Sequence, residues 1–347
     1  MKAHMTLRRV ALAVALGGVS IAPEPLVAQG PEGRWPLQPR TEIGRVVAPF
    51  LEGWYANEDG TFTYSFGYSN LNGDTVEIPL GDKNRIEPAE FHGMQPSVFL
   101  PGRHRGMFGV TVPSSIREDD VWWTITNPDG EVTKVPGRTR WTAYMLDWFP
   151  RPHGSLPPMV SFDDGSGAEG RGPPGIVSRR TLAASVGEPL EVVVEVRDPS
   201  ERDRTDARFR EPIALRVVWS MYQGPTGGQV AFTRHPSTPI PEPPAGRAGR
   251  GGQADAGGAG GAGAGGPAGR GTGAGGGGGG GGGLGAGPAG PETIMVSSGA
   301  GTVRVLATFS APGEYMLNAQ VDNWRTPDSG SGDQCCWTNG YVRIAVR

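Results

Sequence analysis

Two adjacent cysteines, Cys335 and Cys336, have the most distinctive potential chemistry in this sequence, and they are its only cysteines. In an oxidising compartment a thiol pair tends to form a disulfide. Neighbouring Cα atoms are about 3.80 Å apart across a trans peptide, closer than the ~4.4–6.8 Å of ordinary disulfides. A bridge between neighbours would therefore be strained and comparatively reducible. We consider such a vicinal disulfide, acting as a rigid turn, an apolar contact or a redox-sensitive kink. Two separate thiols and bridges between molecules are the alternatives.

Histidines and acidic residues do not form a metal-binding motif in this sequence. His92 and His104 lie near several carboxylates, but HExxH and CxxC patterns are missing from the sequence, and these are the spacings that zinc sites use. The segment 163–167 (DDGSG) lacks the alternating oxygen ligands of a calcium loop and is interpreted as a turn. We therefore predict no metal site and no cofactor.

Catalytic motifs are also missing from the sequence. It has no G-x-S-x-G element, and its five histidines offer few bases for a catalytic triad. The carboxylate pairs Asp119-Asp120 and Asp163-Asp164 would serve a glycosidase only at the correct separation, and neighbours in a loop are more typical of solvated charges. We predict that the chain is not an enzyme, while a carboxylate pair assembled from distant strands stays open.

Aromatic side chains are the remaining candidates for binding. Trp122 and Trp123 are adjacent in a predicted strand, so they must point to opposite faces. Trp123 aligns with Val121 and Ile125 and is predicted to be in the core, which leaves Trp122 as a candidate surface-contact residue together with Trp337. Trp122 could stack on a sugar ring, or it could pack between domains, since large exposed apolar groups usually mark protein contacts.

Alternating apolar residues predict the elements that would position these side chains. In 62–68, Phe and Tyr residues occupy every second position, and the same period recurs in 108–112 and 121–125. This alternation is typical of antiparallel strands that are buried on one face. Turn residues such as those of 127–130 (NPDG) separate the strands. Residues 46–148 are therefore predicted to form an N-terminal β-sandwich.

The second half of the sequence has the same alternation after a Pro- and Gly-rich stretch. Residues 149–180 are predicted to form an extended linker, because repeated prolines suit a linker better than a sheet. Residues 181–347 contain at least five alternating segments, which can bury their apolar faces only against a second sheet or by closure. Residues 243–291 are dominated by Gly, and the entropy cost of ordering them predicts a disordered loop inside this second sandwich.

The N-terminus and the overall charge indicate the compartment. Lys2, Arg8 and Arg9 precede an apolar run at 10–22, followed by Ala28, which is the layout of a secretory signal peptide. The run is shorter than the ~20 residues that a membrane span needs, although an uncleaved anchor is an alternative. We predict a signal peptide at 1–28, export to the periplasm or the exterior, and no transmembrane segment after cleavage. The net charge of −3 gives no general attraction to nucleic acid.

Several short motifs resemble an uncharacterised family of secreted bacterial proteins. They include 53–55 (GWY), 62–70 (FTYSFGYSN), 99–103 (FLPGR) and 334–340 (QCCWTNG). In addition, 309–317 (FSAPGEYML) is similar to the Pro-Gly-x-Tyr strand of PKD-like immunoglobulin-like modules. The resemblance implies immunoglobulin-like sandwich domains, and it supplies no functional residues to transfer.

We therefore expect an exported, non-catalytic binding or structural protein of the cell envelope or extracellular space. Its partner would be an envelope protein or glycan, contacted through β-sandwich surfaces. The alternative is a carbohydrate-binding module or a component of a polysaccharide-acting enzyme that uses exposed aromatics and carboxylates. A fold by itself does not decide between these functions.

Overall fold

β-Strands make up most of the regular structure in the computed structural model of the chain, which describes residues 46–117, 119–151, 154–238, 292–323 and 336–347. The helical elements within these ranges are short 3₁₀ turns, among them η1 (Ala89–Phe91), η2 (Ser114–Ile116) and η3 (Thr142–Tyr144). A helix with the length and apolar character to span a bilayer does not occur in the described ranges. The predicted all-β fold with antiparallel sheets is confirmed. The predicted signal peptide at 1–28 and the Gly-rich loop at 243–291 lie outside the described residues.

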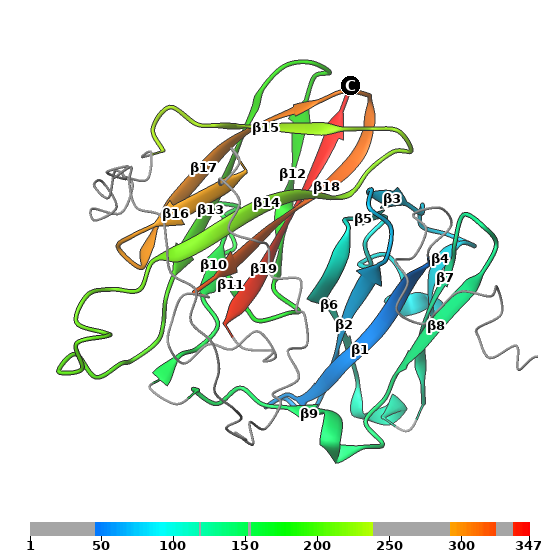
Figure 1. The fold of residues 1–347 in the computed structure, drawn as a ribbon, viewed down its shortest axis with the longest axis horizontal. Coiled ribbons are helices and arrows are strands. Elements are labelled where there is room, and N and C mark those ends of the chain that lie inside the picture. The colour runs from blue at the N-terminus through cyan, green and yellow to red at the C-terminus, as the bar shows by residue number, and fades with distance from the viewer. Residues whose placement is uncertain (1–45, 118, 152–153, 239–291, 324–335) are drawn as a thin grey trace, which may run out of the picture. The chain divides into compact units, whose positions relative to one another are not determined.

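The first sandwich consists of a four-stranded sheet, in the order β6-β2-β1-β9, and a three-stranded sheet, in the order β4-β7-β8 (Figure 1). A two-stranded sheet, β3-β5, accompanies them. The strands are β1 (Val47–Ala56), β2 (Phe62–Asn70), β3 (Val76–Glu77), β4 (Asn84–Glu87), β5 (Val98–Phe99), β6 (Gly102–Val112), β7 (Val121–Thr126), β8 (Val132–Gly137) and β9 (Met145–Leu146). All pairs are antiparallel except β1 with β9.

Aromatic side chains form the core of the first sandwich. Phe66 on β2 and Phe108 on β6 meet Trp123 on β7 edge to face, with ring centroids 6.0 and 5.0 Å apart. All three side chains are fully buried. The prediction that Trp123 is the core member of the Trp122-Trp123 pair is therefore confirmed. Its indole Nε1 donates to Asn84 Oδ1 at 3.0 Å, which satisfies its polar atom inside the core.

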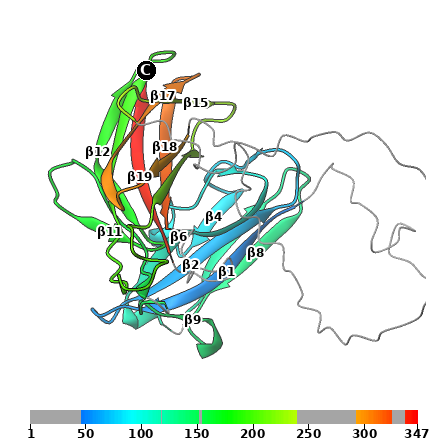
Figure 2. The same cartoon turned by 60° about the vertical axis from the view of Figure 1, so that its left-hand side comes forward.

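The second sandwich contains two five-stranded sheets, ordered β11-β10-β13-β17-β15 and β12-β19-β18-β14-β16 (Figures 1 and 2). Its strands are β10 (Met159–Ser161), β11 (Glu169–Arg171), β12 (Ile176–Ala184), β13 (Leu190–Arg197), β14 (Leu215–Gln223), β15 (Val230–Arg234), β16 (Thr293–Val296), β17 (Ala300–Phe309), β18 (Gly313–Asp322) and β19 (Trp337–Val346). Alternate residues such as Val192, Val194 and Leu317 are buried between the sheets, as the period of two predicted.

The predicted linker at 149–180 differs from the observed structure. This stretch contains β10 and β11 and the start of β12, and β10 pairs with β13 of the second sandwich. Each of β10 and β11 has only three residues, too few for alternation to be recognised. The prolines lie outside the paired residues: Pro157 and Pro158 precede β10, and Pro173 and Pro174 lie between β11 and β12. Proline therefore ends these strands without excluding them.

Polar and aromatic side chains of the second sandwich contact the first sandwich along β6. Tyr341 donates its hydroxyl to the carbonyl of Met107, and Asn339 Nδ2 donates to the carbonyl of Gly106 at 2.7 Å. Tyr222 and Met316 enter the same buried cluster as the core of the first sandwich. Burial raises the pKa of Tyr341 well above its ordinary value, so the hydroxyl stays protonated as the donor in this bond.

Candidate functional site

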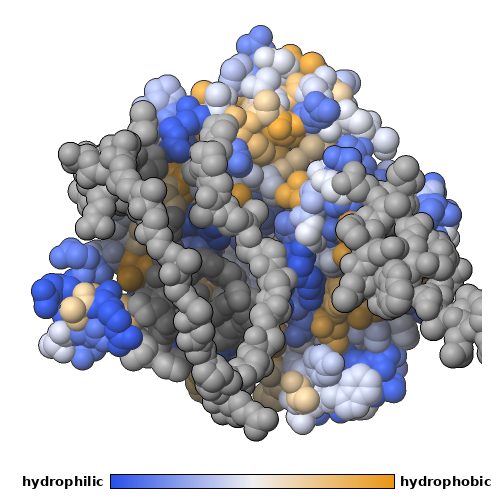
Figure 3. Space-filling model, viewed as in Figure 1, coloured by the Kyte–Doolittle hydropathy of each residue, from blue (hydrophilic) through white to orange (hydrophobic). Residues whose placement is uncertain are grey.

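Four large apolar side chains are exposed within the nine residues 141–149, which we call the aromatic segment. Trp141 is 56% exposed, Tyr144 50%, Met145 50% and Phe149 76%. The described residues contain eight exposed large hydrophobic side chains, so half of them are in this one segment. Figure 3 shows hydrophobic residues gathered near the top of the coloured surface, with hydrophilic residues around them. A concentration of exposed apolar side chains is characteristic of contact sites.

The backbone of the aromatic segment is fixed to β1. The Nε1 of Trp54 donates to the carbonyl of Trp141 at 3.1 Å, and β9 pairs in parallel with Trp54 and Tyr55. The Trp148 ring stacks on Tyr55, with centroids 4.1 Å apart. Alternate residues therefore point inward as anchors, while Met145 and Phe149 point outward. This arrangement fixes the backbone that carries the exposed side chains before any partner arrives, which lowers the backbone part of the entropy cost of binding.

A glycine on β1 makes this close approach possible. Gly53 follows a register shift between β1 and β2, and its φ is +154°. A Cβ at this position would lie 2.5 Å from the carbonyl oxygen of Tyr144 and 2.6 Å from Cγ of Leu146. Gly53 thus sets the distance between β1 and the aromatic segment, because only glycine combines this φ with this contact.

Cations and indole rings alternate beside the aromatic segment. Lys134 Nζ lies 4.8 Å from the ring centroid of Trp122, and the Arg138 guanidinium lies 5.7 Å from the same ring. Arg138 also lies 5.5 Å from the ring of Trp141, whose centroid is 6.3 Å from that of Tyr144. We call these five residues the aromatic–cation row. Each cation–π contact at such a surface is worth about 0.5–1 kcal/mol.

One carboxylate fixes the central arginine of the row. Arg138 Nη2 donates to Asp120 Oδ2 at 2.6 Å, and Arg140 Nη2 lies 3.8 Å from the other oxygen of the same carboxylate. The Arg138 side chain is only 15% exposed, whereas that of Arg140 is 53% exposed. Asp120 therefore holds Arg138 between the two indoles. From its sequence context, Asp120 resembles a solvated loop charge or a glycosidase carboxylate. In the structure its carboxylate forms ion pairs with Arg138 and Arg140.

The two predicted surface-contact residues have different outcomes. Trp122 is half-buried and lies on the outer face of the β4-β7-β8 sheet. Its ring contacts are with Lys134 and Arg138 of its own sandwich. Trp337 is 3% exposed and donates its Nε1 to the carbonyl of Gly106 at 3.3 Å. The prediction of surface contact at Trp337 is therefore wrong, because β19 packs this face against β6 of the first sandwich.

Of the two cysteines, only Cys336 lies among the described residues. It is fully buried, takes part in a disulfide and has a φ of +86°, which is uncommon for a residue other than glycine. Cys335 lies outside the described residues, so the vicinal disulfide stays a prediction.

The histidines that were considered as metal ligands are held within the first sandwich. His92 Nδ1 accepts from the backbone N–H of Ile86 at 3.2 Å. His104 stacks on Tyr68 with centroids 4.8 Å apart, and its Nε2 lies 3.1 Å from the carbonyl oxygen of Pro101. Among the residues that the structure describes, no group of three or more His, Cys, Asp or Glu side chains could hold a metal ion.

The acidic turn at 163–167 is held by backbone N–H groups of the turn and of Arg179. Asp164 accepts from the N–H of Ser166 at 2.9 Å and from the N–H of Arg179 at 2.7 Å. The hydrogen bonds from Ser166 first, and then from Arg179, lower the pKa of Asp164 to about 2. A carboxylate with so low a pKa stays ionised and cannot act as a general acid near neutral pH. The interpretation of this segment as a turn fits these contacts.

A buried carboxylate on β1 lies between arginines. The Glu52 side chain is 5% exposed, and Arg103 Nη2 lies 2.6 Å from its Oε1, with Arg105 at 3.9 Å from the other oxygen. Burial raises the pKa of Glu52, and the two arginines oppose this shift without overcoming it. Arg103 also stacks on the partly exposed ring of Phe50, 4.0 Å from its centroid. Glu52 therefore pairs with cations and has no carboxylate partner in this cluster.

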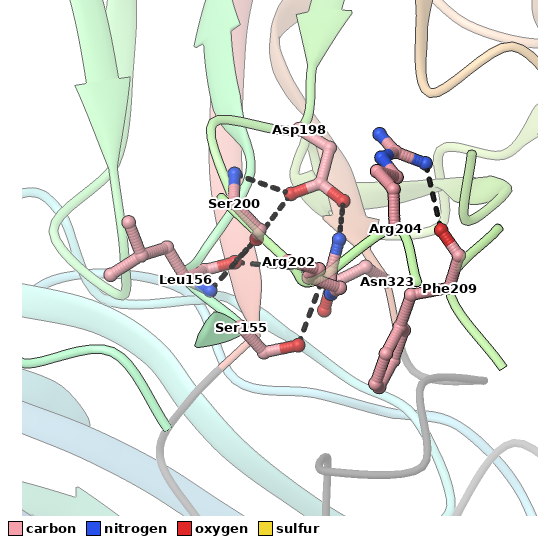
Figure 4. Close-up of polar contacts among 8 residues, drawn as sticks. All are labelled: Ser155, Leu156, Asp198, Ser200, Arg202, Arg204, Phe209 and Asn323. Carbon is pink, nitrogen blue, oxygen red and sulfur yellow. Dashed lines mark hydrogen bonds and ion pairs between the residues drawn. The ribbon is translucent and has the colours of Figure 1, made fainter. Parts of the chain in front are cut away.

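A buried polar cluster holds the chain around Leu156 on the second sandwich (Figure 4). Asp198 Oδ2 accepts from Arg202 Nη1 at 2.7 Å, with both side chains less than one-tenth exposed. The second Arg202 nitrogen, Nη2, donates to Ser155 Oγ at 2.7 Å. The backbone N–H of Leu156 donates to Ser200 Oγ, and its carbonyl accepts from Asn323. These bonds tie three segments together, so we interpret the cluster as a structural clamp.

Comparisons with known proteins add little to this geometry. No family model matches the chain, and no curated protein matches it. One solved structure, described as a crystal structure of a protein of unknown function from Porphyromonas gingivalis W83, is similar to it with 7% identity and a TM-score of 0.22. That likeness covers 86% of this chain and 99% of the other. The family resemblance inferred from sequence motifs stays a prediction.

The aromatic segment is the feature that sequence reasoning did not single out. Trp141, Tyr144 and Phe149 belong to a crowded set of aromatics, but they follow no period of two. This lack of alternation is the sequence feature that indicates their exposure, because large aromatic residues outside a strand pattern have no sheet core in which to be buried. Their exposure follows from β9 and Trp148, whose pairing with β1 could not be read from local sequence.

Proposed function

We propose that the chain is an exported, non-catalytic binding protein of the cell envelope or extracellular space, which holds its partner on the aromatic segment. One observation carries this proposal: Trp141, Tyr144, Met145 and Phe149 are 50–76% exposed on a backbone that is anchored to β1. Aromatic residues, Met and Arg are enriched in protein interfaces, and Trp, Tyr and Arg dominate their binding energy.

The energetics support binding by this segment. Fully burying one large apolar side chain contributes about 1.5–3 kcal/mol, so completing the burial of these half-exposed groups would add roughly 1 kcal/mol each. Arg140, whose side chain is 53% exposed, carries guanidinium N–H groups beside them. Because the backbone of the segment is already anchored to β1, little of this gain is lost to ordering the backbone on binding.

Export is supported by the N-terminal residues, where basic residues precede a short apolar run. N-terminal sequencing of the protein recovered outside the cytoplasm tests it. A new N-terminus at Gln29 is expected, and an intact Met1 on soluble cytoplasmic protein would contradict it.

Sedimentation with envelope material tests the binding role. Purified protein is mixed with envelope fractions from the producing cells, and the bound fraction is compared with that of the double variant Tyr144→Ser/Phe149→Ser. Both side chains are exposed, so the variant should fold normally, and circular dichroism checks this. We expect at least tenfold weaker retention for the double variant. Val186→Ser changes an exposed apolar residue of the second sandwich and should leave retention unchanged. Equal retention of all three proteins would refute the proposal.

A further inference from the structure

The exposed rings of the aromatic segment have a face available to a flat ligand. Arg138 lies 5.5 Å from the ring centroid of Trp141, yet the side chain is 56% exposed. The neighbouring ring of Tyr144 is 50% exposed and tilted by 48° to the indole. The face of an aromatic ring is electron-rich, so it attracts weakly positive C–H groups such as those on one side of a pyranose.

Positive charge accompanies these rings. Lys134 and Arg138 lie over the rings of Trp122 and Trp141, Arg140 precedes Trp141 in the chain, and both arginines are within ion-pair distance of the one carboxylate of Asp120. This local excess contrasts with the net charge of −3 of the whole chain. The planar guanidinium of Arg140, 53% exposed, has the fork geometry that recognises a carboxylate with two hydrogen bonds.

Cations and rings alternate in the order Lys134, Trp122, Arg138 and Trp141, and this order has a chemical complement. A linear polymer of uronic acids presents one ring and one carboxylate in every residue. Rings of such a polymer would stack on the exposed indole of Trp141, while its carboxylates meet the exposed side chains of Lys134 and Arg140. We infer that the ligand of this site is an acidic polysaccharide of uronate type. The inference rests on the proposed function, because it names the ligand class of the same site.

A pair of polysaccharides with the same sugar ring tests the inference. Polygalacturonate carries a free carboxylate on each residue, whereas in highly methyl-esterified pectin most of these carboxylates are masked as neutral esters. Binding of the purified protein to each is measured by titration calorimetry in low salt. We expect polygalacturonate to bind at least tenfold more tightly than the ester, and its affinity to fall as salt is added. Equal affinity for the two polymers would overturn the acidic class.

Variants separate ring stacking from charge recognition. Trp141→Ala should weaken binding to both polymers by about tenfold, because it removes the ring on which the sugar stacks. Lys134→Gln/Arg140→Gln should weaken binding to polygalacturonate severalfold and leave the weak binding of the ester unchanged. Val186→Ser, an exposed position on the second sandwich, is the matched control. An effect of the charge variant on both polymers alike would contradict the assignment of carboxylate recognition.

The experiments distinguish a wrong ligand class from a wrong binding role. If neither polymer binds, while envelope retention still depends on Tyr144 and Phe149, the polysaccharide class is wrong and the binding role stands. Protease treatment of the envelope fraction identifies that case, because loss of retention after proteolysis indicates a protein partner and overturns the inference. If retention is unaffected by the aromatic variants, both proposals fail.

Discussion

Substitution of Gly53 by alanine tests whether β1 fixes the aromatic segment. The added Cβ would lie 2.5 Å from the carbonyl oxygen of Tyr144 and 2.6 Å from Cγ of Leu146, and the φ of +154° disfavours a side chain. Backbone strain of this kind costs about 1–3 kcal/mol, and overpacking adds about 1–3 kcal/mol. We therefore expect Gly53→Ala to lower the free energy of unfolding by roughly 2–6 kcal/mol.

Gly60 provides the matched control for this substitution. It also has a positive φ, +81°, but a Cβ there would meet nothing within 4 Å. Gly60→Ala should cost only the backbone term, about 1–2 kcal/mol. Urea denaturation of both variants measures the two costs, and hydrogen exchange across residues 141–149 shows where any loosening occurs. The reasoning is refuted if Gly53→Ala costs no more than Gly60→Ala, or if exchange in the aromatic segment is unchanged.

Two further predictions concern the first sandwich and its contact with the second. Tyr341→Phe removes the hydroxyl that donates to the Met107 carbonyl, so urea denaturation should show a loss of about 1–3 kcal/mol from leaving a buried acceptor without its donor; an unchanged midpoint would contradict this contact. Burial first, and then the charge of Arg103, lower the pKa of His104 below its ordinary value of 6.5. The unfolded chain therefore binds more protons, and the stability that His104 contributes is present above pH 6.5 and is lost as the pH falls through the lowered pKa. His104→Phe keeps a ring on Tyr68 and should flatten this pH dependence in thermal unfolding, whereas an identical dependence in both proteins would exclude His104 as its source.

Strands with alternating apolar residues could be predicted from the sequence, although the polar face of β2, with Thr63 and Ser65, is also buried. The alternation at 62–68 and 121–125 corresponds to β2 and β7, and it also identified Trp123 as a core residue. The turn at 127–130 is formed as predicted, with the N–H of Gly130 donating to the carbonyl of Asn127 at 2.9 Å. These strands and this turn depend on residues close together in the chain, so they can be predicted from a single sequence.

Features that depend on distant partners could not be predicted in the same way. Trp337 is buried because its indole meets the carbonyl of Gly106, 231 positions away in the chain. The short strands β10 and β11 exist because β13 and its neighbours extend a sheet to them. The aromatic–cation row is assembled from β7, β8 and the segment after β8, and Asp120 in the loop before β7 fixes its central arginine. No local pattern records which of these segments meet.

The most direct test of the central claim is a hydrogen-exchange footprint of the purified protein with and without envelope material. The account predicts slower exchange within residues 132–149 on binding, with the sheet β11-β10-β13-β17-β15 of the second sandwich unaffected. Protection confined to that second sandwich, with residues 141–149 exchanging as fast as in the free protein, would contradict it.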